Sequence, residues 1–343
     1  MIDRPAMRRL IVFGLSIGCL LGCDYSESRM QAGTQIVASF DIGSGSTRML
    51  VAEVDQCSGQ VIRPLDQASV KLDWSDDLLR QGNGGFSAEM IHSGIEAIDG
   101  LVDRARQWQP ERIQGVATQA FRLAGNAEEV LVALEQAGLD ARVISQDEEG
   151  QMAWQLVDQT LPARSQPLVV WDMGAGSQQW VWQQPEGTWQ HAHSDLASVT
   201  FKLRVIETLN RPEGSHSPNP VTGAERARLD GLGAEWFGNQ ASLREALASQ
   251  PEVVGIGGVH GISIPRQLGI GAGDRITRVD LEAAVNQQLG KSDTEIGGKY
   301  AATDVTNLIL VAELMSWLGL EAYRFLAADL TRAQLLTART DCR

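Results

Sequence analysis

The sequence contains little cysteine and fewer basic than acidic residues. Four of its 343 residues are cysteines, with no Cys-x-x-Cys pair and no Cys/His cluster at metal-ligand spacing, which argues against a structural zinc site. Lysine and arginine number 29 against 43 aspartates and glutamates, and the formal charge of −14 argues against nucleic-acid binding because like charges repel. The length predicts about two domains, at roughly 100–200 residues each.

Residues 1–23 have the pattern of an export signal. Three arginines precede an apolar run, 10–21, that is too short to span ~30 Å of hydrocarbon. The run ends in Leu-Leu-Gly-Cys at 20–23, which resembles the lipobox of bacterial lipoproteins. We therefore expect a signal peptide over 1–22 and a diacylglycerol on Cys23. A secretory signal with a chance cysteine, or a buried helix, are the alternatives.

The residue after the lipobox cysteine suggests a location. Asp24 resembles the signal that retains Gram-negative lipoproteins in the inner membrane, so we expect a lipid anchor on the periplasmic face of that membrane, with 23–33 as a tether. Removing the signal removes three arginines and one aspartate, which takes the charge from −14 to −16. Cys57 and Cys342 either form one disulfide in this oxidising compartment or remain unpaired thiols.

Two glycine-rich segments recur at the same offsets. Asp-Ile-Gly-Ser-Gly-Ser-Thr at 41–47 and Asp-Met-Gly-Ala-Gly-Ser-Gln at 172–178 lie 131 residues apart. Each follows an apolar strand pattern, at 36–40 and 168–171, and precedes a further β-prone run. One such loop is weak evidence, because glycine also serves ordinary turns. The pair predicts a duplicated α/β unit.

Strand and helix patterns alternate from residue 34 onward. We predict an N-terminal domain over 34–160 and a C-terminal domain over 161–343, whose last helix packs back on the first domain. Alternating Trp180 and Trp182 indicate a sheet face rather than a base-stacking platform. The other predicted segments are a helix after Ser87, helices over 127–136, 308–320 and 326–336, and a loop over 210–221.

The glycine loops have the chemistry of a phosphate site. Glycine lets backbone N–H groups approach an anion closely, and hydroxyls add donors. Asp41 and Asp172 end their strands, where a carboxylate can hold Mg²⁺. Each could instead cap its own turn, but two facing loops favour phosphate. The candidate phosphate-binding residues here are Gly43, Ser44, Gly45, Ser46, Thr47, Arg48, Gly174, Ala175, Gly176 and Ser177.

An acidic run supplies a candidate base. Asp147, Glu148 and Glu149 begin a predicted helix, and adjacent acids beside a phosphate loop can have one pKa raised toward neutrality. The helix macrodipole alone also favours acids in a first turn, and spacing by itself favours that explanation.

The motifs together resemble the exopolyphosphatase/guanosine pentaphosphate phosphatase (Ppx/GppA) family of the actin-like ATPase superfamily. The resemblance implies two duplicated actin-like, ribonuclease H-like α/β domains with the active site in the cleft between them. The segments that carry it are 41–48 (family DIGSNSxR), 117–126 (ATxAxRxAxN), 143–151 (ISGxEEAR), 172–178 (DIGGGST), 254–259 (VGxGGT) and 302–320.

The resemblance also implies an activity, Mg²⁺-dependent release of terminal phosphate from polyphosphate or pppGpp. Glu149, with Glu148 beside it, would orient or activate the attacking water, and Arg122 would balance phosphate charge. Gly257 and Gly258 form a third phosphate turn. The acidity of the chain restricts the substrate to a short one that enters the cleft with Mg²⁺, and a homodimer is left open.

The sequence departs from the family pattern at several positions. Gly45 replaces Asn, Gln178 replaces Thr, Gln179 replaces Glu, Gln146 replaces Gly and Gln151 replaces Arg. Several of these changes remove carboxylate or phosphate partners. The alternative function is therefore a catalytically weak protein of the cell envelope that binds or senses a phosphorylated ligand.

Overall fold

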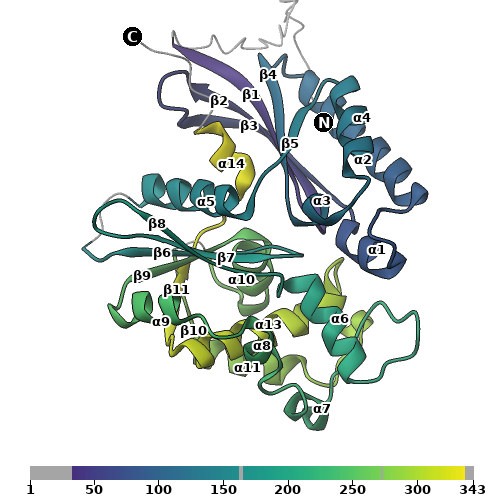
Figure 1. The fold of residues 1–343 in the computed structure, drawn as a ribbon, viewed down its shortest axis with the longest axis vertical. Helices are drawn as coiled ribbons and strands as arrows, with labels where there is room; N and C mark the ends of the chain where they lie inside the picture. The colour runs from purple at the N-terminus through teal and green to yellow at the C-terminus, as the bar shows by residue number, and fades with distance from the viewer. Residues whose placement is uncertain (1–32, 162–164, 272, 337–343) are drawn as a thin grey trace, which may run out of the picture. The chain divides into compact units, whose positions relative to one another are not determined.

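The computed structural model describes residues 33–161, 165–271 and 273–336. Figure 1 shows a mixed α/β fold with two β-sheets. The first sheet has the order β3-β2-β1-β4-β5, in which β2 is antiparallel to β1 and β3, whereas β4 and β5 run parallel to β1. Its strands are β1 (Thr34–Ile42), β2 (Ser46–Asp55), β3 (Val61–Lys71), β4 (Arg112–Ala117) and β5 (Asp140–Val143).

The second sheet repeats this topology. Its order is β10-β11-β9-β6-β7-β8, and β8-β7-β6-β9-β11 follows the same order and directions as the five strands of the first sheet. This repetition confirms the duplicated α/β unit predicted from the two glycine-rich segments. The strands are β6 (Leu168–Met173), β7 (Gln178–Gln183), β8 (Trp189–Ser194), β9 (Glu252–Ile256), β10 (Arg275–Thr277) and β11 (Ala322–Phe325).

Four helices accompany the first sheet: α1 (Trp74–Gln81), α2 (Ala88–Arg106), α3 (Gln119–Leu123) and α4 (Ala127–Gln136). The Ser87 hydroxyl accepts a hydrogen bond from the Met90 amide and caps α2, as the sequence predicted. α4 has the predicted bounds. Phe40 of β1, Ile98 of α2 and Leu134 of α4 lie in one fully buried core.

The helix α13 (Ala301–Leu318), of which 14 residues are buried, shares one hydrophobic core with the second sheet. Among the described residues this helix alone is long and apolar enough to cross a membrane, but 72% of it is buried within the fold, which is typical of a core helix. Trp180 and Trp182 are buried in β7, which confirms a sheet face. The other elements are α6 (Ser198–Thr208), α7 (Gly223–Ala227), α8 (Leu232–Phe237), α9 (Ala241–Ala248), the π-helical turn Val259–Ser263, α10 (Ile264–Leu268), α11 (Arg278–Gln288) and α12 (Asp293–Ile296).

Two helices lie side by side between the sheets, α5 (Gln146–Thr160) and α14 (Leu330–Leu335) (Figure 1). α5 follows the first sheet in sequence but packs on β6 and β7, whereas α14 comes from the end of the chain and packs on β1 and β2. The helix predicted over 326–336 is wrong at its start, because the Asp329 carboxylate accepts a hydrogen bond from the Thr331 amide and begins α14 at Leu330. The predicted loop over 210–221 is confirmed.

Candidate active site

The two glycine-rich segments form equivalent turns that face each other. In the first, the Gly43 amide donates to Ser46 O at 3.0 Å, and in the second the Gly174 amide donates to Ser177 O at 3.0 Å. A Cβ on Gly45 would lie 2.8 Å from Ala175 Cβ, closer than real Cβ atoms come, so glycine is required where the turns meet. Gly176 is equally restricted, since a Cβ there would lie 2.8 Å from Ser44 Oγ.

A cavity of about 210 Å³ opens along these turns. It brings together most of the residues that the sequence singled out. They are Asp41, Gly43, Ser44, Gly45, Ser46, Arg48, Glu149, Asp172, Gly174, Ala175, Gly176, Ser177, Gly257 and Gly258.

Three predicted site residues do not line this cavity. Thr47 is fully buried inside β2. Adjacent residues of a helix point about 100° apart, so Glu148 points away from the cavity that Glu149 lines. Glu148 is instead ion-paired with Arg142. Arg122 lies behind the cavity wall and donates hydrogen bonds to Glu149 and Ser177, which do line it.

The predicted cysteine chemistry falls largely outside the described residues. Cys57 is disulfide-bonded. Cys342, its predicted partner, and Cys23, the predicted lipidation site, both lie outside the described residues. The pairing and the lipid anchor therefore stay predictions.

Asp41 and Asp172 occupy equivalent places at the ends of β1 and β6. Arg48 Nη1 donates to Asp41 Oδ2 at 3.3 Å, and Gln179 Nε2 donates to Asp172 Oδ2 at 2.8 Å, in each case from the facing residue of the next strand. Burial raises the pKa of Asp41 to about 7, against the lowering effect of Arg48. Burial and repulsion by Glu149 raise the pKa of Asp172 to about 8.

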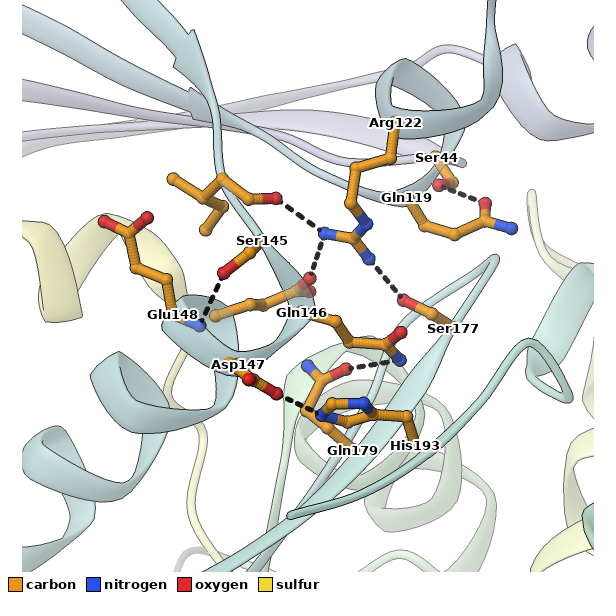
Figure 2. Close-up of polar contacts among 12 residues, drawn as sticks. Ser44, Gln119, Arg122, Ser145, Gln146, Asp147, Glu148, Ser177, Gln179 and His193 are labelled. Carbon is orange, nitrogen blue, oxygen red and sulfur yellow. Dashed lines mark hydrogen bonds and ion pairs between the residues drawn. The ribbon is translucent and has the colours of Figure 1, made fainter. Parts of the chain in front are cut away.

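Glu149 enters the site from the first turn of α5. The Ser145 hydroxyl accepts from the Glu148 amide and fixes the start of this helix. Arg122 Nη1 donates to Glu149 Oε2 at 2.8 Å, and Figure 2 shows the same guanidinium reaching the Ser177 hydroxyl. Burial raises the pKa of Glu149, and the Arg122 guanidinium opposes this rise. A buried carboxyl with a raised pKa suits proton transfer near neutral pH.

The charges around the cavity fit a divalent cation. The lining contains the six carboxylates Asp41, Asp73, Asp76, Glu149, Asp172 and Asp329, against the four cationic side chains Arg48, Lys71, Lys202 and Lys299. With all six carboxylates ionised, an anionic phosphate would meet an excess of negative charge, which a bound divalent cation would offset. Carboxylate oxygens are the ligands that Mg²⁺ takes, so Asp41 and Asp172 fit the role predicted for them.

Asp329 and Lys202 are among the lining residues that the sequence did not predict. Asp329 precedes α14, and its Oδ2 lies 4.0 Å from Arg48 Nε. The stretch Asp-Leu-Thr-Arg at 329–332 loosely resembles a family motif and was the available signal. Lys202 Nζ bonds Asp76 Oδ1 at 2.8 Å across 126 residues of sequence, a pairing that no local pattern predicts.

The molecule has a duplicated α/β fold with a cavity between two equivalent glycine turns. The sequence profile of the Ppx/GppA phosphatase family matches residues 50–194. A Ppx/GppA enzyme of Aquifex aeolicus is 18% identical over 89% of this chain and 99% of its own, with a TM-score of 0.65. An exopolyphosphatase of Cytophaga hutchinsonii is 13% identical over 89% of this chain and 99% of its own, with a TM-score of 0.71.

These likenesses show a shared fold. The chain has the two-domain actin-like ATPase fold of the Ppx/GppA structures, which confirms the predicted fold class. The match over 50–194 includes β2 from residue 50 onward, the whole of α5 and the second glycine turn.

Proposed function

We propose that the protein is a Mg²⁺-dependent phosphohydrolase that releases the terminal phosphate of a short polyphosphate or a pppGpp-like nucleotide. One observation carries the proposal: two equivalent glycine turns and three buried carboxylates, Asp41, Asp172 and Glu149, line a single cavity. The family match over 50–194 supports phosphoanhydride hydrolysis as the class of reaction.

The chain supplies three functions to such a reaction. The turns at 43–46 and 174–177 offer backbone N–H groups and serine hydroxyls to the phosphate oxygens. Arg48, at the mouth of the first turn, adds a positive charge. Glu149 positions the attacking water and accepts its proton, while Arg122 fixes the direction of the carboxylate. Mg²⁺ bound by Asp41 and Asp172 would neutralise charge on the transferred phosphoryl group.

The cavity favours a slender substrate. Its volume of about 210 Å³ is below the ~300–1,000 Å³ typical of pockets for drug-sized ligands. The acidic chain does not attract long polyanions. A short phosphate chain therefore fits better than a long polymer, and better than a nucleotide whose base must also enter.

A second candidate function is phosphate-ligand binding without turnover. Gln178, which replaces the family threonine, is fully buried and bonds Trp171 Nε1 and Leu196 O, so it offers nothing to a ligand. Glu149 is also held in an ion pair with Arg122. Both features reduce the polar groups available for catalysis but leave the two turns intact.

The proposal is tested by measuring phosphate release by the purified full-length protein, with and without Mg²⁺. The substrates are short-chain polyphosphate and pppGpp. We expect release that depends on Mg²⁺ and that Glu149→Gln abolishes. Glu148→Gln is the matched control, because Glu148 lies one residue away in the Arg142 ion pair outside the cavity, and it should retain activity. Inert wild-type protein that binds these ligands by calorimetry would support the binding function and refute the enzyme.

A further inference from the structure

Two histidines and an aspartate meet beside the candidate active site. His191 and His193 are two residues apart on β8, so their side chains lie on the same face of the strand. That face lies against α5, whose first turn presents Asp147. Figure 2 shows the Asp147 carboxylate pointing at the His193 ring, next to Gln179.

The three side chains are close enough to share one ion. Asp147 Oδ1 lies 2.9 Å from His193 Nε2 and 3.8 Å from His191 Nδ1, and the three candidate ligand atoms lie within 4.8 Å of one another. Zn²⁺ takes nitrogen at about 2.0–2.1 Å and carboxylate oxygen at about 2.0–2.2 Å, which leaves neighbouring ligand atoms ~3–3.5 Å apart. Small side-chain rotations would bring the observed separations to these values.

The two nitrogens that face Asp147 are buried, and one of them has no hydrogen bond. His191 Nδ1 makes no hydrogen bond within the described residues, and His193 Nε2 contacts Asp147 Oδ1 at 2.9 Å, although both nitrogen atoms are shielded from solvent. A buried polar atom without a hydrogen bond, such as His191 Nδ1, costs stability and so calls for an explanation, and a bound ion is one. The Asp147 side chain is 59% exposed, which leaves a route for an ion from solvent.

We propose that Asp147, His191 and His193 bind a divalent first-row transition-metal ion of the Zn²⁺ class. Imidazole nitrogen suits zinc, copper, iron and nickel, whereas Mg²⁺ prefers oxygen alone. The site therefore differs in chemistry from the all-carboxylate pair Asp41 and Asp172. Three protein ligands leave a coordination position for water.

Metal at this site would fasten the first turn of α5 to β8. Glu149 lies in the same turn as Asp147, and the neighbouring Gln146 donates to Gln178 O at 3.0 Å. Gly150 permits the close approach, because a Cβ there would overlap Val181 and come within 3.5 Å of His191 Nδ1. The ion would thus restrain the helix turn that carries the candidate base without itself touching the phosphate cavity.

Calorimetric titration of the purified full-length protein with Zn²⁺ tests the site. Chelator first removes bound metal, and excess Mg²⁺ is then added to occupy Asp41 and Asp172. We expect one Zn²⁺ per chain in wild type. The double variant His191→Ala/His193→Ala should lose more than the ~10–100-fold in affinity that removal of an outer-shell partner costs. His92→Ala, an exposed histidine on α2, is the matched control and should bind as wild type does.

Further variants separate this site from the phosphate cavity. Asp41→Asn/Asp172→Asn should keep its Zn²⁺ affinity, and Co²⁺ bound to wild type should show ligand-field absorption that the histidine double variant lacks. Retained thermal unfolding of the double variant establishes that it is folded. Zn²⁺ binding that survives in the histidine variant, or is absent from wild type, would overturn the proposal whatever the phosphate assay shows.

Discussion

Gln179 donates a hydrogen bond to Asp172 in the same way that Arg48 donates one to Asp41. Each donor faces its aspartate across an antiparallel strand pair, seven residues later in the chain, and bonds the Oδ2 atom. The duplication thus preserves the geometry, but one half uses a positive guanidinium and the other a neutral amide. Asp172 has the higher pKa, about 8 against about 7, in keeping with this difference.

The first prediction concerns this amide. Gln179→Glu replaces a donor to Asp172 with a third acidic group beside Asp172 and Glu149. We expect the melting temperature in chelator to fall at pH 8, because the buried carboxylates then repel one another, and the stabilisation by Mg²⁺ to grow. Thermal unfolding with and without Mg²⁺ measures both effects. Gln183→Glu, at the exposed end of β7, is the control and should change neither.

The second prediction is a fall in stability with rising pH in the absence of metal. Burial raises the pKa of Asp41 and Asp172 from 3.8 to about 7 and about 8. Between pH 4 and 8 the folded protein therefore holds protons that the unfolded chain has released, and linkage then lowers stability as pH rises, by at most ~1.4 kcal/mol per pH unit for each group.

Denaturant unfolding in chelator at several pH values measures this slope. Asp41→Asn/Asp172→Asn should flatten it, because the amides do not titrate. A slope of opposite sign over this range in the wild type would show that the two carboxyls are charged in the folded protein.

Much of this site could be predicted from sequence because its motifs are local. The two turns, Asp41, Asp172 and Glu149 lie in short patterns whose chemistry is readable without a fold, and the 131-residue repeat predicted the matching topology. The direction of the Glu148 side chain could not be predicted in this way. Side-chain direction one residue from Glu149 depends on which face of α5 packs on the second sheet.

Features set by distant contacts escaped prediction. Lys202 reaches Asp76 from another part of the chain, and the His191, His193 and Asp147 cluster forms only because α5 packs across β8. The start of α14 was misplaced because the apolar residues at 326–328 extend the helix pattern, whereas the Asp329 carboxylate accepts from the Thr331 amide and begins the helix at Leu330.

The third prediction concerns the ion pair behind the cavity. Arg122→Ala leaves the Glu149 carboxylate buried without its cation, which costs up to about 3–5 kcal/mol where such a charge is fully buried. The loss should be larger at pH 8 than at pH 5, since protonation of Glu149 relieves it. Arg142→Ala breaks the more exposed pair with Glu148 and should cost under ~1 kcal/mol. Equal losses in denaturant unfolding would refute this assignment.

The fourth prediction tests the packing of α5. Gly150→Ala places a methyl group against Val181 Cγ2 and should destabilise by about 1–3 kcal/mol through overpacking. Gly100→Ala, in the middle of α2 with no atom within 4 Å of the added Cβ, should instead stabilise by about 0.5–1 kcal/mol. Chemical denaturation measures the free energy of unfolding of both variants, which we expect to fall for Gly150→Ala and to rise for Gly100→Ala.

The fifth prediction concerns the anchor. Cys23→Ser should block lipidation and release the protein from the membrane fraction, while phosphate release by the purified variant remains as in wild type. Fractionation with immunodetection, and the mass of the mature N-terminus, measure it. Unchanged membrane association of the variant would contradict the lipobox.

The placement of α5 and α14 has a consequence for how the chain can be divided. A fragment that ends after α5 would carry a helix whose apolar residues Ala153 and Val157 have lost their sheet, and it would lack the α14 residue Leu335, which packs beside Val37 and Leu50. The complementary fragment would expose the matching surfaces. Each half therefore buries part of its apolar surface only against the other half, and we expect neither to fold alone. The same contacts hold the two halves together and so maintain the cavity between them.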